Sequence, residues 1–250
     1  MRKIVVTSGK GGVGKTTVTA SLGRKLADMG YRVVLVDADV GLNNLDVVVG
    51  IESRVVYDVG VVLAGRCRIF QALVPDHEST LKVLPSSNGN VEISAQAFRG
   101  VVDSLSDFDI VLIDCPAGIE RGFHRAVSAA TEALVVTTPS ASAIRDADKV
   151  VALLSGYRLE DVGLVVNRLR PDMVAKGEMM SSSDVSRLLH TPAVGVIPED
   201  DCITLYQQLG RVPDFALSEK AFSVLAANVA NRTKNCAELR YPRRRFGRWL

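Results

Sequence analysis

A glycine-rich string near the N-terminus constrains the fold of this chain more than any other feature. Residues 9–16 read G-K-G-G-V-G-K-T and match the pattern G-x-x-x-x-G-K-[S/T] at every position. An apolar run at 3–7 precedes the string, and an amphipathic helical pattern over 15–29 follows it. A strand, a glycine loop and a helix in this order gather backbone N–H groups and a helix N-terminus around a phosphate. We therefore predict a nucleoside triphosphate site.

The rest of the chain alternates between short apolar runs and longer amphipathic segments. The runs are typical of buried parallel strands and lie at 3–7, 32–37, 81–84, 110–114, 133–137, 162–167 and 193–197. Helical patterns lie between them at 15–29, 93–105, 121–130, 144–154, 182–189 and 218–231. This alternation predicts an α/β fold, a P-loop NTPase whose mostly parallel, doubly wound sheet carries helices on both faces. We expect one domain over 1–236, followed by a separate segment at 237–250.

Composition excludes several classes of protein. Hydrophobic residues make up 47% of the 250 residues, which is enough for a full core. The four cysteines form no C-x-x-C pair, so neither a zinc ribbon nor a thioredoxin-type site is indicated. The N-terminal apolar run is too short for a signal peptide, and no stretch approaches the roughly 20 apolar residues of a membrane span. We expect a cytoplasmic protein.

Charged side chains follow the loop and the ends of two predicted strands. Lys15 would neutralise the β- and γ-phosphates, and the Thr16 hydroxyl would bind Mg²⁺. Asp37 and Asp39 end one strand, and Asp114 ends another after the apolar string I-V-L-I. The carboxyl ends of parallel strands meet beside the phosphate loop in this architecture. The sequence therefore predicts carboxylates that support a metal ion and an attacking water molecule.

A second lysine inside the loop, Lys10, makes the string resemble the deviant Walker A motif of the ParA/MinD family of ATPases. The resemblance implies that Lys10 reaches across a homodimer interface to the partner's nucleotide and, with Lys15 and Asp39, is catalytic. It implies that Asp39 orients water, and that Asp37 and Asp114 hold Mg²⁺ through water. The nucleotide-binding residues of the loop would be Gly11, Gly12, Val13, Gly14, Lys15, Thr16 and Thr17.

Later strings extend the resemblance to the septum-placing branch of that family, over about residues 3–201. They include G-L-N-N-L-D at 41–46, P-A-G-I-E at 116–120 and G-V-I-P-E-D at 195–200. The guanine-selective string N-K-x-D is absent, and the resemblance implies that ATP is read by Asn167, Pro198, Glu199 and Asp200. A partner surface is implied at Asn44, Arg145, Asp146 and Asp148.

The C-terminal segment 237–250 is rich in arginine. It carries five Arg and one Glu, and it ends in an aromatic and aliphatic stripe at helical spacing. Members of this branch end in a short amphipathic helix on the membrane, and arginines favour anionic headgroups. By this resemblance the lipid contacts would be Phe246, Trp249, Leu250, Arg244, Arg245 and Arg248. The alternatives are a solvated basic tail and, less favoured, a tail that binds nucleic acid.

The resemblance implies a Mg²⁺-dependent ATPase that dimerises with ATP, binds the cytoplasmic face of the membrane and places the division septum. Its implied partners are a MinC-like inhibitor of division-ring assembly and a MinE-like or other activator. Two other functions within the family are a DNA-bound partition ATPase and a flagellar-number regulator. An iron–sulfur reductase that uses Cys115 is a remote alternative, because a bridging cluster needs a second cysteine from each subunit.

Overall fold

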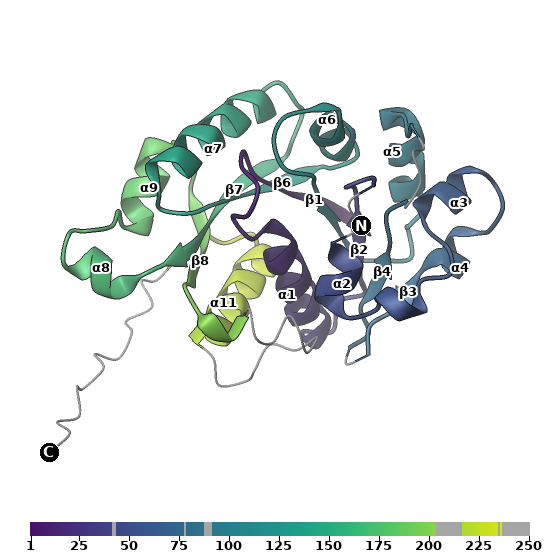
Figure 1. Ribbon diagram of the computed structural model, residues 1–250, viewed down its shortest axis with the longest axis horizontal. Coiled ribbons are helices and arrows are strands. Elements are labelled where there is room, and N and C mark those ends of the chain that lie inside the picture. Colours follow the sequence, from purple (N-terminus) through teal and green to yellow (C-terminus); the bar gives the residue numbers. More distant parts are fainter. Residues whose placement is uncertain (42–43, 78, 88–91, 204–216, 235, 237–250) are drawn as a thin grey trace, which may run out of the picture.

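The computed structural model describes residues 1–41, 44–77, 79–87, 92–203, 217–234 and 236. In this part of the chain an eight-stranded sheet has the order β3-β4-β2-β5-β1-β6-β7-β8 (Figure 1). All neighbouring strands pair in parallel except the short edge pair of β3 and β4. The strands are β1 (Arg2–Thr7), β2 (Val33–Asp37), β3 (Val74–Pro75), β4 (Lys82–Leu84), β5 (Ile110–Asp114), β6 (Glu132–Thr137), β7 (Asp161–Leu169) and β8 (Ala193–Pro198).

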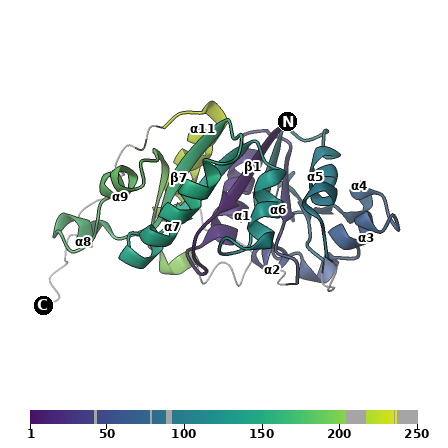
Figure 2. The same cartoon turned by 90° about the horizontal axis from the view of Figure 1, so that it is seen from above.

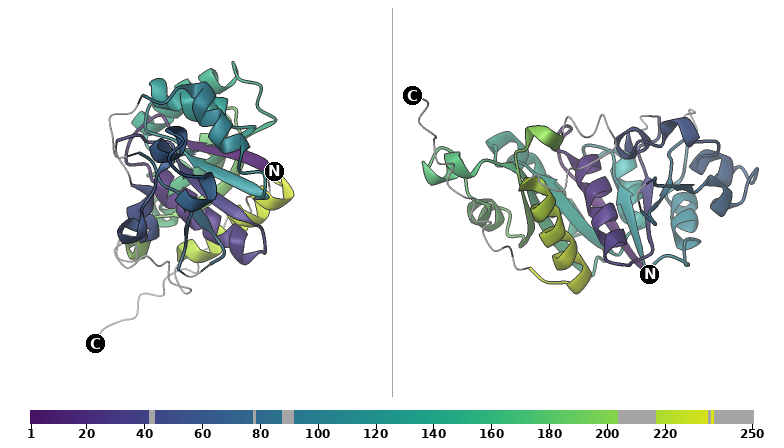
Figure 3. Two further views of the ribbon diagram at one scale, coloured as in Figure 1. Left: turned by 90° about the vertical axis from the view of Figure 1, so that its right-hand side faces the viewer. Right: turned by 90° about the horizontal axis from the view of Figure 1, so that it is seen from below.

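Helices cover both faces of the sheet, as the alternating pattern predicts (Figures 2 and 3). One face packs against α1 (Lys15–Asp28), α2 (Leu45–Val49) and α11 (Leu217–Asn231). The other carries α5 (Ala95–Asp103), α6 (Arg121–Ser128), α7 (Ala141–Leu154) and α9 (Ser182–Leu188). The central strands are buried throughout, because each apolar side chain meets a helix whichever face it points to. The doubly wound fold is confirmed.

The structure also contains short elements that the sequence pattern does not reveal. They are the two-residue strand β3, the 3₁₀ turn η1 (Glu52–Arg54), and the helices α2, α3 (Val59–Leu63), α4 (Ile69–Ala72) and α8 (Pro171–Ala175). Each is too short to show a period of 3.6 or 2. The predicted helix at 144–154 begins three residues earlier, at Ala141, where Ser140 takes the N-cap position. Among the described residues, no helix is both long and apolar enough to cross a bilayer.

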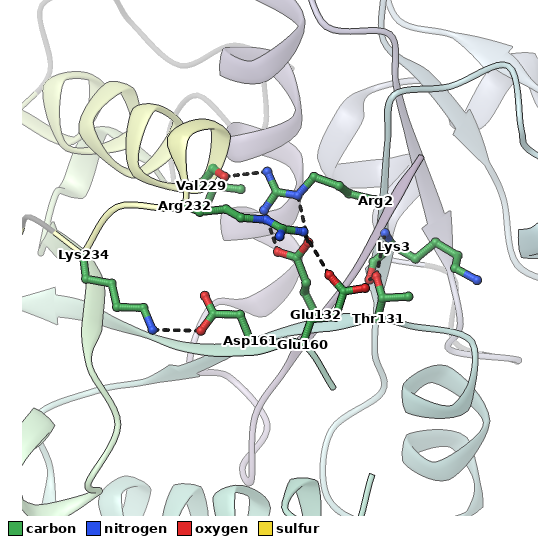
Figure 4. A network of polar contacts seen from close by, with 9 residues as sticks. All are labelled: Arg2, Lys3, Thr131, Glu132, Glu160, Asp161, Val229, Arg232 and Lys234. Carbon is green, nitrogen blue, oxygen red and sulfur yellow. Dashed lines mark hydrogen bonds and ion pairs between the residues drawn. The ribbon is translucent and has the colours of Figure 1, made fainter. Parts of the chain in front are cut away.

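A network of ion pairs closes the edge of the sheet opposite the phosphate loop, at the amino ends of β1, β6 and β7 (Figure 4). Arg2 donates from Nε and Nη2 to the two oxygens of Glu132, at 2.8 and 2.5 Å. Arg232, just beyond α11, contacts Glu132 at 2.9 Å and Glu160 at 3.0 Å. Burial opposes ionisation, but the two guanidinium groups hold the pKa of Glu132 below its ordinary value. The network fastens the end of α11 to the sheet.

Candidate active site

The glycine loop leaves β1 and turns directly into α1, as predicted. Gly12 and Gly14 have φ angles of 76° and 96°, in the left-handed region that favours glycine. Gly14 is also the N-cap residue of α1, and a Cβ there would lie 2.4 Å from Nδ2 of Asn167. Lys15 begins the helix and is only 8% exposed. Backbone N–H groups, a helix N-terminus and a buried lysine thus converge where a phosphate chain would bind.

The Asp114 carboxylate lies against the first turns of α1. Its Oδ2 accepts a hydrogen bond from the Thr16 hydroxyl at 2.7 Å, and its Oδ1 accepts one from Thr19 at 3.0 Å. Burial raises the pKa of Asp114 to about 6, although the two hydroxyl donors and the charge of Lys15 act in the opposite direction. A cation beside this carboxylate would favour its ionised form. The environment therefore suits a bound divalent ion.

Asp37 and Asp39 complete a group of three carboxylates. Asp37 is paired in register with Asp114 across β2 and β5, so the strand ends bring the two side by side. Burial raises the pKa of Asp37 well above its ordinary value, and the charge of Asp114 raises it further. Asp37 also accepts hydrogen bonds from the backbone N–H groups of Asp39 and Leu45, so it braces the start of the following loop. Asp39 is half-buried, and burial raises its pKa against the opposing charges of Lys15 and Arg125.

These residues fit the coordination chemistry of Mg²⁺. The ion prefers oxygen ligands and retains several waters, and it is usually held by one or two carboxylates together with substrate phosphates. Thr16, Asp37 and Asp114 supply a hydroxyl and two buried carboxylates beside Lys15. Buried like charges next to one another are costly unless a cation compensates them. The fold thus brings the three predicted metal residues together, at a place where a cation would compensate the buried carboxylates.

Lys10 points away from this group toward α7. Its Nζ donates to the Ser142 hydroxyl at 3.3 Å, and its backbone carbonyl accepts from the Ser8 hydroxyl at 2.8 Å. The loop also packs tightly on this helix, since a Cβ at Gly9 would lie 2.1 Å from the backbone oxygen of Asp146. In a single chain, Lys10 thus contacts α7, the helix that carries Arg145, Asp146 and Asp148 of the predicted partner surface. Its role across a dimer interface stays a prediction.

The residues expected to read the base gather at the ends of β7 and β8. Asn167 is 5% exposed and donates from Nδ2 to the Val13 carbonyl at 2.8 Å, so it also braces the phosphate loop. Pro198 pairs with Leu169, and the Glu199 N–H donates to the Leu169 carbonyl at 3.0 Å. Asp200 accepts from the Ser218 hydroxyl at 2.7 Å, which ties it to the start of α11. Their contact with adenine stays a prediction.

Sequence reasoning missed two residues of the site, Thr19 and Arg125. Arg125 on α6 donates from Nη2 to the Ala38 carbonyl at 2.8 Å, one residue before Asp39. It faces a cavity of about 420 Å³ that Asp39, Gly41, Pro116 and Phe123 also line. In the sequence, the only sign of Arg125 was a polar residue in a helical pattern whose apolar face packs on the sheet.

The iron–sulfur alternative depends on Cys115. This residue is 2% exposed, and burial raises its pKa to about 12, which disfavours the thiolate that a cluster would need.

The predicted partner and membrane residues have different outcomes. Arg145 and Asp148 are exposed on α7, and Asp146 is partly buried and paired with Lys149 at 3.1 Å. Asn44 takes the N-cap position of α2. The predicted lipid contacts lie outside the described residues; they are Phe246, Trp249, Leu250, Arg244, Arg245 and Arg248.

Comparison with known families agrees with this geometry. Residues 4–211 match the family described as the CobQ/CobB/MinD/ParA nucleotide binding domain. The septum site-determining protein MinD of Synechocystis is 49% identical over 213 residues, which covers 84% of this chain and 80% of that protein.

Solved structures give the same result. The MinC:MinD cell division protein complex of Aquifex aeolicus superposes with a TM-score of 0.86 at 38% identity, covering 95% of this chain and 98% of that chain. The septum site-determining protein MinD of Pyrococcus horikoshii, complexed with Mg-ADP, gives a TM-score of 0.83 at 31% identity, covering 91% and 95%.

Proposed function

The chain belongs to the MinD group of the CobQ/CobB/MinD/ParA nucleotide-binding family, and we propose from this premise that it is a Mg²⁺-dependent, membrane-cycling ATPase that places the division septum. The observation that carries the proposal is the convergence of Lys15, Thr16 and three strand-end carboxylates at one edge of the sheet. A related protein binds Mg-ADP, which supports the same cofactors here.

The three carboxylates have different roles in the proposed reaction. Asp37 and Asp114 are almost fully buried and would anchor the water shell of the metal. Asp39 is more accessible and lies beside the cavity, so it can hold a water molecule in line with the γ-phosphate. Lys15 neutralises charge on the phosphates, as lysine does in phosphate loops of this kind. Hydrolysis of ATP to ADP and phosphate follows from this arrangement.

Dimerisation would place Lys10 against the partner's nucleotide. In the single chain its Nζ has only the Ser142 hydroxyl among the described contacts, and this bond is long, at 3.3 Å, and exposed, so it is easily exchanged. A cation beside developing charge on the γ-phosphate stabilises the transition state of phosphoryl transfer. We therefore assign Lys10 to a second active site in an ATP-bound homodimer.

The segment 237–250 would connect the dimer to the membrane. A helix of about nine residues is too short to be stable alone in water, but an anionic surface can stabilise it. One such segment binds weakly, and two in a dimer bind far more strongly through their effective concentration. ATP thus makes a membrane-bound dimer and hydrolysis releases it. The partners we propose are a MinC-like inhibitor, in line with the Aquifex complex, and a MinE-like or other activator.

Sedimentation with vesicles that contain anionic lipid tests this proposal. The intact chain should pellet with ATP and stay soluble with ADP or without nucleotide. Trp249→Glu should bind nucleotide normally and fail to pellet, because a charge replaces the interfacial aromatic ring. A chain that ignored vesicles but retarded duplex DNA when ATP is present would instead be a partition ATPase, and the membrane function would be wrong.

A further inference from the structure

Thr19 is a buried hydroxyl that the proposed chemistry does not use. It lies on α1 three residues after Thr16, so both side chains project from the same face of the helix. Its side chain is completely buried, and its hydroxyl lies 3.0 Å from Oδ1 of Asp114 and 3.0 Å from the Lys15 carbonyl. A hydroxyl has one proton to donate, and an ionised carboxylate is a stronger acceptor than a neutral carbonyl. The bond to Asp114 therefore dominates when this carboxylate is charged.

The two oxygens of Asp114 have different partners as a result. Oδ2 faces Thr16, which the phosphate-loop pattern places at the metal, and Oδ1 faces Thr19 one turn deeper in the helix. A carboxylate that is 4% exposed and held at both oxygens cannot rotate without leaving a buried acceptor unsatisfied. The bond from Thr19 thus fixes the plane of the carboxylate and keeps Oδ2 directed toward Thr16.

We propose that Thr19 is a positioning residue for Mg²⁺, which acts by holding Asp114 in the orientation that supports the metal. This inference rests on the proposed Mg²⁺-nucleotide site and adds to it a specific residue outside the phosphate-loop motif. Thr19 does not touch the nucleotide, so its effect should appear in the Mg²⁺ dependence of nucleotide binding. Binding of the nucleotide without the metal should not change.

The test compares Thr19→Val with Thr19→Ser. Valine has nearly the same shape as threonine but no donor, and serine keeps the donor while losing one methyl group. The probe is a fluorescent ADP analogue titrated at fixed free Mg²⁺ concentrations and again with excess chelator. Thr19→Val should need about tenfold more Mg²⁺ for the half-maximal gain in affinity, the effect expected for a lost hydrogen bond to a charged group. Its affinity in chelator should equal that of the parent chain, and Thr19→Ser should resemble the parent in both conditions.

Three results would overturn the inference. An unchanged Mg²⁺ requirement in Thr19→Val would show that Asp114 needs no help from this hydroxyl. An equal loss of affinity with and without Mg²⁺ would assign Thr19 a general structural role. If Thr19→Val does not fold, Thr19→Ala is measured in the same way. Failure of both to fold, with a folded Thr19→Ser, also makes the role structural.

The outcome in the parent chain separates this inference from the proposed function. A parent whose nucleotide affinity responds to Mg²⁺, together with an unaltered Thr19→Val, refutes only the role of Thr19. A parent whose nucleotide affinity is indifferent to Mg²⁺ refutes the proposed site and this inference together.

Discussion

Replacing Glu132 by Gln should destabilise the fold without touching the nucleotide site. The Glu132 side chain is only 6% exposed, and it receives contacts from Arg2 and Arg232, which are 21% and 52% exposed. Glutamine keeps the size of the side chain but removes the charge and places an N–H₂ group against a guanidinium donor. Breaking a fully buried ion pair costs about 3–5 kcal/mol. Because water screens Arg232, we expect Glu132→Gln to lower the free energy of unfolding by about 2–3 kcal/mol in this partly exposed network.

Thermal unfolding followed by circular dichroism measures this loss. For a chain of this size each kcal/mol lowers Tm by about 2–4 °C, so Glu132→Gln should melt about 4–12 °C below the parent. Glu160→Gln is the matched control. Glu160 is 57% exposed and contacts only Arg232 in this network. Glu160→Gln should therefore lower the free energy of unfolding by less than about 1 kcal/mol.

The pH dependence gives a second check. The two arginines lower the folded-state pKa of Glu132, so its contribution is present above the unfolded value and is lost as pH falls through the folded value. The difference in Tm between the parent and Glu132→Gln should therefore reach its full size at pH 7.5. It should become smaller below about pH 4.3, the ordinary pKa of Glu. If Glu132→Gln melts no lower than Glu160→Gln at pH 7.5, the buried ion pairs of Glu132 do not stabilise the fold as proposed.

Three further substitutions separate the roles assigned to the loop and its neighbours. Lys10→Ala should keep ATP affinity, remain monomeric and lose stimulated hydrolysis by roughly a hundredfold or more; full stimulated turnover in a strictly monomeric variant would contradict its role in trans. Asp39→Ala should lose turnover by about 10²–10⁴-fold yet form a stable ATP dimer; loss of nucleotide binding instead, in a fluorescence titration, would mean that its role is mistaken. Gly9→Ala should force α7 away from the loop, because the added Cβ would meet the Asp146 carbonyl at 2.1 Å. The free energy of unfolding, measured by denaturant titration, should fall by about 1–3 kcal/mol. An unchanged denaturation midpoint would argue against this close approach.

The central part of the fold could be predicted because its sequence signals are local and strong. Strands such as β5 are continuous apolar runs of ordinary strand length, and they end in the charged residue that the site needs. The glycine loop has a position-by-position pattern, and the carboxyl ends of parallel strands must share an edge. Asp37 and Asp114 could therefore be placed together from the sequence alone, and their register pairing confirms it.

What the sequence could not reveal depends on contacts between distant segments. The strand β3 is two residues long, and the bond from Arg125 to the Ala38 carbonyl spans 87 positions. In the sequence, Thr19 cannot be distinguished from other polar residues of an amphipathic helix. Its role depends on Asp114, which the sheet places against its hydroxyl. The sequence predicts that Asn167 reads the base, and its bond to the Val13 carbonyl is an additional contact that no local pattern indicates.

The mass of the chain in solution shows whether ATP drives dimerisation, the step that joins nucleotide binding to membrane attachment in the proposed cycle. Light scattering coupled to gel filtration should report a monomer of 26.9 kDa with Mg-ADP or without nucleotide. With Mg²⁺ and a non-hydrolysable ATP analogue, the chain should give about twice that mass, and Lys10→Ala should stay at the monomer value under the same conditions. A parent chain that binds the analogue and remains a monomer would mean that ATP does not drive dimerisation.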